Sequence, residues 1–205
     1  MSEGISSLLT REASGGPLAA FAPADAAVDV GVPSVGTSLP GSYADAMRRW
    51  QRAEDLSAWA GPRFRFDAER ALQFSSTQRR EGPPPAITEP EAFFAEPAGI
   101  CLDLARFAVE TLRRIDPAAV ASYLMVEFEP MLVDGHTLRL HWMATFRRGG
   151  QLFFFADSDR PGHVAGPYST AQDFIADYER FRGRPVVRHL ELDSLQRPPP
   201  GAAAR

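Results

Sequence analysis

The sequence predicts an α+β fold in which one buried helix packs against a small antiparallel sheet. Apolar residues recur at helical spacing from Cys101 to Ile115, so this segment is expected to form the buried helix. Beyond Asp116 the pattern changes to alternating or continuous apolar runs of strand length. The turn Arg148-Gly149-Gly150 separates two of these runs. Consecutive antiparallel strands are therefore expected.

The composition indicates one globular domain with two tails. The chain has 205 residues, of which 44% are hydrophobic, and this is enough for a single core. Residues 1–42 consist mainly of Ala, Gly, Ser, Pro and Val without periodicity, which predicts a disordered N-terminal arm. Residues 196–205 include three consecutive prolines and predict a disordered tail. The domain is expected to span residues 43–195.

The elements on either side of the buried helix follow from the same patterns. Ser42 can cap a helix whose apolar residues recur at spacings of three and four up to about Ala60. After a proline-rich stretch, Thr88 and Glu91 form a capping box for a short helix that ends near Glu96. Strands are expected at 121–128, 138–146 and 152–156, followed by a helix at 170–181 and a last strand at 185–192.

Charge and composition exclude several functions. The net charge is -4 and the 22 basic residues, all Arg, are scattered, so nucleic acid is not expected as a partner. The sequence contains neither Lys nor Asn, which excludes a lysine nucleophile, a Schiff base and a Cys-His-Asn triad. Cys101 is the only cysteine, so internal disulfides and metal sites built from CxxC pairs are excluded. No cofactor and no metal are expected.

The N-terminal region does not resemble a secretory signal. It carries an acid at Glu3, a base at Arg11 and only a short apolar stretch. No run of about 18 apolar residues occurs anywhere, so no membrane span and no membrane partner are expected. We expect a cytoplasmic protein, or one exported by a route without a Sec signal. The arm is a candidate recognition segment for a partner protein.

Cys101 is expected in the first turn of the buried helix. Unsatisfied backbone N–H groups and the positive end of the helix dipole at such a position favour the thiolate form of a cysteine. A lone cysteine on an apolar helix face is also typical of core packing. The position of Cys101 alone therefore leaves a reactive thiol and a core residue as alternatives.

Two further residues favour the reactive thiol. His141 lies in the middle of an apolar strand, and Asp157 ends the next strand after the glycine turn. In a hairpin centred on that turn, positions whose numbers add to about 298 face each other, so these two residues are expected to be direct cross-strand neighbours. An acid there holds the imidazole tautomer and stabilises the imidazolium. Asp159 ends the same strand on the same face and stays a second candidate for this role.

The sequence resembles the transglutaminase-like superfamily, and within it the bacterial transglutaminase-like cysteine peptidases, over about residues 43–192. The matching motifs, in order, are Glu89-Pro90-Glu91, Gly99, Cys101-Leu102-Asp103-Leu104-Ala105, His141-Trp142 and Phe155-Ala156-Asp157. Many family members place acids on both sides of the nucleophile, a pattern that in some supports calcium. Here the flanking residues are Ile100 and Leu102, so calcium binding is not carried over. Asp103 keeps the last acid of that pattern.

The resemblance implies a papain-like core and a Cys-His-Asp triad formed by Cys101, His141 and Asp157. The implied activity is that of a thiol hydrolase, a peptidase or amidase acting on a protein or peptide substrate through a thioester. The backbone N–H of Cys101 is expected to contribute to the oxyanion hole, with a residue near Phe93 or Phe94 at its border.

Two alternatives stay open. The same triad serves an acyl transferase or a glutamine deamidase, because these enzymes share the thioester. A non-enzymatic binding module, or a delivered effector or cargo recognised through its disordered arm, is the other alternative.

Overall fold

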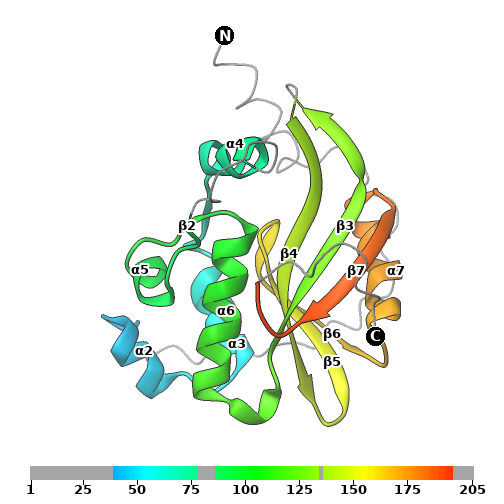
Figure 1. Ribbon diagram of the computed structural model, residues 1–205. Coiled ribbons are helices and arrows are strands. Elements are labelled where there is room, and N and C mark those ends of the chain that lie inside the picture. The colour runs from blue at the N-terminus through cyan, green and yellow to red at the C-terminus, as the bar shows by residue number, and fades with distance from the viewer. Residues whose placement is uncertain (1–38, 78–85, 134–135, 196–205) are drawn as a thin grey trace.

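The computed structural model describes residues 39–77, 86–133 and 136–195, and the fold has three layers (Figure 1). A five-stranded antiparallel sheet forms the middle layer. On one face of the sheet α3 and α6 pack directly against the strands, with α2 and α5 packed against α6, and α7 packs on the other face. The helices are α2 (Tyr43–Arg49), α3 (Ala53–Ala60), α4 (Ala68–Thr77), α5 (Pro90–Ala95), α6 (Cys101–Ile115), the 3-10 turn η1 (Pro117–Ala119) and α7 (Ala171–Arg182). This arrangement confirms the predicted α+β class.

The sheet is a meander to which one later strand is added. Its strands are β3 (Ser122–Val133), β4 (His136–Arg148), β5 (Gln151–Asp157), β6 (Arg160–Tyr168) and β7 (Val186–Leu192), in the spatial order β6-β5-β4-β3-β7. Consecutive hairpins join β3 to β6, and α7 leads the chain back so that β7 pairs with β3. A separate short parallel pair, β1 (Arg65–Phe66) and β2 (Ala98–Gly99), precedes α6.

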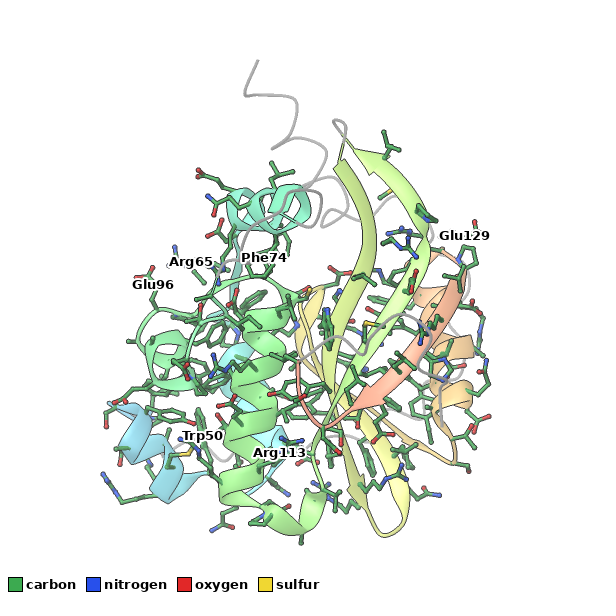
Figure 2. All side chains as sticks on the ribbon, in the orientation of Figure 1. Trp50, Arg65, Phe74, Glu96, Arg113 and Glu129 are labelled. Carbon is green, nitrogen blue, oxygen red and sulfur yellow. The ribbon has the colours of Figure 1, made fainter. Side chains whose placement is uncertain are left out.

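Aromatic rings fill the core between α6 and the neighbouring helices. The ring of Phe107 on α6 lies 4.9 Å from that of Phe93 and 5.2 Å from that of Trp59. Phe94 stacks on Trp59 with ring centroids 4.7 Å apart. Figure 2 shows Trp50 on the side of α6 that faces away from the sheet. Its ring meets that of Phe107 edge-on. Phe93 and Phe94 therefore contribute their rings to this core.

Two elements near the N-terminus differ from the prediction. The helix expected from Ser42 to Ala60 is two helices, because the carboxylate of Asp55 accepts hydrogen bonds from the backbone N–H groups of Gln51 and Arg52 and starts a new helix there. The capping box at Thr88 is also wrong. The N-cap of α5 is Glu89, and the Thr88 backbone N–H donates to Asp103 instead.

The sequence does not predict α4 or β6. The strand β6 contains Pro161, Gly162, Gly166 and Pro167, which are uncommon in central strands. Its place at the edge of the sheet tolerates them. Gly162 also lies so close to Gly61 that a Cβ added to either glycine would come within 3.0 Å of the Cα of the other. Glycine at both positions lets β6 approach the end of α3.

Asp103 fixes the N-terminal end of α6. Its buried carboxylate accepts hydrogen bonds from Nε and Nη2 of Arg70, both at 2.9 Å, from the backbone N–H of Thr88 at 2.8 Å and from that of Ile100 at 2.9 Å. These donors come from α4, from the segment before α5 and from the N-cap of α6. A Cβ at Gly99 would lie 2.7 Å from the same carboxylate, which explains a glycine there. One side chain thus joins three segments around Cys101.

We expect Arg70→Met to lower the free energy of unfolding by about 3 to 5 kcal/mol at neutral pH, because the Asp103 carboxylate would stay buried without its cation. Chemical denaturation measures this loss. Arg65→Met is the matched control, since Arg65 and its partner Glu96 are both exposed (Figure 2) and such pairs contribute about 1 kcal/mol or less.

The loss in free energy of unfolding caused by Arg70→Met should be smaller in acid. Burial alone would raise the pKa of Asp103, but the hydrogen bonds from Arg70, Ile100 and Thr88 hold this pKa below its ordinary value of 3.8. A carboxyl group of this kind contributes stability above its unfolded pKa and loses the contribution as pH falls through the lower, folded pKa. If Arg70→Met loses the same free energy of unfolding at neutral pH and in acid, or loses no more than Arg65→Met, then the ion pair with Asp103 does not have this stabilising role.

Candidate active site

Cys101 occupies the first residue of α6, directly after the N-cap Ile100. Its side chain is partly exposed and packs at the border of the core between α6 and the sheet. The first backbone N–H groups of a helix precede its regular hydrogen bonds and carry the positive end of the helix dipole. The thiol therefore lies where negative charge is stabilised.

His141 and Asp157 form a buried pair on neighbouring strands. Nε2 of His141 lies 3.0 Å from Oδ1 of Asp157, and the two residues are 7% and 4% exposed. Burial alone would lower the pKa of His141. The hydrogen bond with Asp157 and the interaction with the Cys101 side chain outweigh burial and raise this pKa to about 10. The structure therefore brings together all three residues of the predicted triad.

Asp157 has two further donors. The backbone N–H of Asp159 donates to Oδ1 at 3.1 Å, and Nε of Arg160 donates to Oδ2 at 3.3 Å. Burial would raise the pKa of Asp157, but the hydrogen bond from His141, the positive charge of His141, the hydrogen bond from the Asp159 backbone and the positive charge of Arg182 hold the pKa well below its usual range. The carboxylate stays ionised at neutral pH, so it can orient the imidazole and stabilise the imidazolium.

The register that brings the pair together is not the predicted one. The turn is the two-residue loop Gly149-Gly150, both with positive φ, so Arg148 pairs with Gln151 and each residue of β4 faces a β5 residue one position later than expected. This register alone would set Asp157 opposite Trp142, on the other face of the sheet from His141. The ladder between β4 and β5 ends at Phe155, however, and the next residue, Ala156, is left-handed with φ 58°. That conformation turns Asp157 towards His141.

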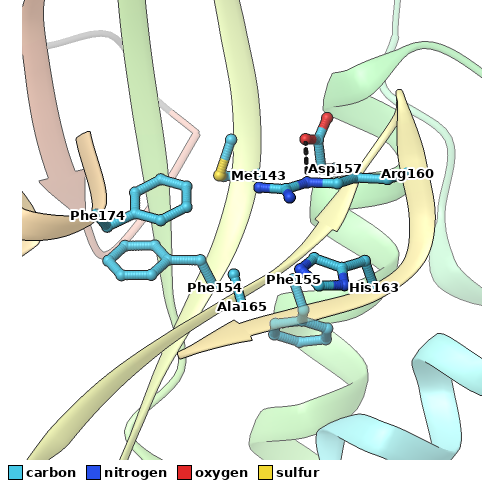
Figure 3. A pocket seen from close by; sticks show the side chains of 8 residues that line it. All are labelled: Met143, Phe154, Phe155, Asp157, Arg160, His163, Ala165 and Phe174. Atoms are coloured by element: carbon cyan, nitrogen blue, oxygen red, sulfur yellow. Dashed lines mark hydrogen bonds and ion pairs between the residues drawn. The ribbon is translucent and has the colours of Figure 1, made fainter. Parts of the chain in front are cut away.

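Asp159, the second candidate for the acid, has different surroundings from Asp157. Asp159 pairs with Arg182 and is 43% exposed at its side chain, whereas Asp157 bonds to the imidazole. His163 lines a small cavity together with Asp157 and Arg160. Figure 3 shows the ion pair between Asp157 and Arg160 at one end of the cavity. The stacked rings of Phe154 and Phe174 lie at the other end. The cavity measures about 10 Å³, which suits one water molecule and not a substrate.

Sequence reasoning missed three neighbours of the pair. Arg160 bonds to Asp157, and Tyr178 and Arg182 reach the pair from α7. The helical periodicity marks Tyr178 as a core residue, and the two arginines resemble ordinary exposed charges in the sequence. The packing of α7 on the sheet brings Tyr178 and Arg182 to the pair, and the turn between β5 and β6 brings Arg160 to Asp157.

Comparison of the sequence with protein-family models finds no match, and comparison with curated proteins finds none either. Within residues 39–77, 86–133 and 136–195, no helix is long and apolar enough to cross a membrane. The same residues contain no group of three or more His, Cys, Asp or Glu side chains that could hold a metal ion.

We expect Asp157→Asn to lower the free energy of unfolding by about 2 to 4 kcal/mol near pH 5.5, because the buried imidazolium loses its anionic partner. The loss should depend on pH. His141 has a raised pKa, so its contribution is complete below its ordinary value of 6.5 and is lost as pH rises towards about 10. Asp157 has a lowered pKa, so its contribution is lost as pH falls below 3.8.

Urea denaturation of wild type and variant across this pH range measures the effect. Asp177→Asn is the control, because Asp177 forms an exposed pair with Arg180 on α7, and its removal should cost about 1 kcal/mol or less. A difference between wild type and Asp157→Asn that does not vary between pH 5.5 and pH 10 would rule out the charged pair.

Proposed function

We propose that the protein is a thiol hydrolase that cleaves an amide or peptide bond with Cys101, His141 and Asp157 as its catalytic triad. The observation that carries the proposal is the buried His141–Asp157 hydrogen bond beside the thiol at the first residue of α6. A nucleophile, a base and a residue that orients the base are the three parts that nucleophilic catalysis needs. A papain-like core and membership of the transglutaminase-like superfamily belong to the same proposal.

The proposed reaction has two stages. Because the raised pKa of His141 favours the imidazolium, the thiol proton of Cys101 passes to His141 before the substrate binds, and the resulting thiolate attacks the carbonyl carbon of the substrate. The tetrahedral intermediate collapses as the C–N bond breaks, and the imidazolium gives its proton to the leaving amine. A thioester remains. Water then attacks the thioester while His141 takes one of its protons, and the acid product leaves as that proton returns to the cysteine sulfur.

The end of α6 supplies the electrostatic support for this reaction. The N–H of Cys101 is the first helical amide, so it is free to donate to an oxyanion that forms beside the sulfur. Asp103 and Arg70 hold this helix end without taking part in the chemistry, because the carboxylate already binds four donors. Rigid placement of the amide and the thiol is what the tetrahedral intermediate requires.

Alkylation of the folded protein with iodoacetamide is the first test. Cys101 is the only thiol, so the label reports on it alone. An unperturbed thiol with a pKa of about 8.5 is only about 0.3% thiolate at pH 6. We expect the wild type at pH 6 to react at least about tenfold faster than glutathione, and His141→Gln to lose this advantage. His189→Gln is the matched control, because His189 lies on β7, two strands away from His141 in the sheet.

Labelling of Cys101 only after unfolding would count against the proposal. Fast labelling justifies a substrate panel of peptides and amides, with product masses measured for wild type and Cys101→Ala. Cleavage supports a hydrolase of peptides. Incorporation of an amine without cleavage would instead indicate an acyl transferase, and conversion of a glutamine to glutamate would indicate a deamidase. These enzymes share the thioester with the hydrolase and differ in the acceptor.

A further inference from the structure

The ring of Tyr178 on α7 lies beside the imidazole of His141. The two ring centroids are 6.1 Å apart and the ring planes differ by 29°. Tyr178 is fully buried, and burial raises the pKa of its phenol, so the side chain is neutral at physiological pH. Tyr178 also packs against Phe174, with centroids 5.2 Å apart, which places the ring within the core under α7.

Hydrogen bonds connect Tyr178 to the turn that carries Asp157. Nη1 of Arg182 donates to the Tyr178 hydroxyl at 3.1 Å, and the same arginine forms an ion pair with Asp159. The backbone N–H of Asp159 donates to the Asp157 carboxylate, which bonds His141. The contacts therefore form a closed circuit that runs from His141 through Asp157, Asp159, Arg182 and Tyr178 back to His141.

We propose that Tyr178 is a positioning residue for His141 and that Arg182 and Asp159 fix its ring to the turn beside Asp157. This inference rests on the proposed function of His141. The hydrogen bond to Asp157 fixes one ring nitrogen, but it leaves the imidazole able to turn about that bond. The Tyr178 ring, packed beside the imidazole, restricts this rotation. The two contacts together keep the opposite edge of the imidazole facing Cys101.

The ring also favours the charged form of His141, because the face of an aromatic ring attracts a cation. The charged groups near the imidazole are Asp157 and Arg160 on the β5–β6 side and Arg182 on α7, with Cys101 at the end of α6. Arg160 pairs with Asp157 and Arg182 pairs with Asp159, so the two guanidinium charges are largely balanced. Loss of the Tyr178 ring should therefore destabilise the imidazolium.

The test compares substitutions on α7 in the full-length protein. Tyr178→Leu removes the ring, Tyr178→Phe keeps the ring without the hydroxyl, and Arg182→Gln breaks the link to Asp159. Arg180→Gln is the matched control, because Arg180 lies on the same helix but pairs with Asp177 at the surface. The readouts are the NMR titration of the His141 ring, assigned by its loss in His141→Gln, and the pH profile of iodoacetamide alkylation.

We expect Tyr178→Leu to lower the midpoint of the His141 titration by about 1 pH unit and to slow alkylation at pH 6 about tenfold. Tyr178→Phe should restore most of both values. Arg182→Gln should give a smaller change in the same direction, and Arg180→Gln should match wild type. A structural role alone would change the unfolding temperature of Tyr178→Leu without moving the titration of the folded fraction.

The inference is overturned if folded Tyr178→Leu titrates and labels like wild type. If Tyr178→Leu does not fold, Arg182→Gln decides, and a wild-type titration in that variant overturns the link to Asp159 and with it the inference. The proposed function fails separately. A wild type with an activated Cys101 that turns over no amide would remove the hydrolase but leave the role of Tyr178 intact, because neither readout needs a substrate.

Discussion

The buried carboxylate of Asp103 is the constraint on which the arrangement of the helical layer depends. A carboxylate out of water is costly unless donors surround it, and here a guanidinium and two backbone N–H groups supply four hydrogen bonds. These donors belong to segments that lie far apart in the sequence, so the chain must fold around the acid. The consequence is that the first turn of α6, and with it the thiol, has a fixed position relative to α4 and the segment before α5.

The second buried acid, Asp157, has a different kind of partner. Asp103 is held mainly by groups that stay protonated, whereas Asp157 shares its carboxylate with an imidazole that can gain or lose a proton. Because His141 can gain or lose a proton, the charge of the Asp157–His141 pair can change during a reaction at Cys101. Arg70 stays protonated, so the charge of the Asp103–Arg70 pair does not change. The helical layer thus supplies a rigid thiol, and the sheet supplies a pair whose charge can change.

Much of this organisation could be predicted because it depends on local pattern. The spacing of apolar residues in 101–115 defines α6, and the apolar runs with a Gly-Gly turn define β4 and β5. Residue chemistry, the expected hairpin register and the family resemblance together selected Cys101, His141 and Asp157. The register could not be fixed to within one residue, because the sequence does not say whether Arg148 belongs to the turn. The role of Tyr178 was hidden for a related reason, since α7 packs on the sheet through contacts distant in sequence.

The conformation of Ala156 shows why the orientation of Asp157 could not be predicted from the sequence pattern. A left-handed alanine costs about 1 to 2 kcal/mol relative to its preferred conformations, and glycine would adopt it freely. The alanine methyl, however, lies in the core between the sheet and the helices, where Ala156 is buried. Packing therefore offsets a backbone conformation that local propensity disfavours. That conformation orients Asp157 towards His141, so the geometry of the pair depends on a residue whose own preference argues against it.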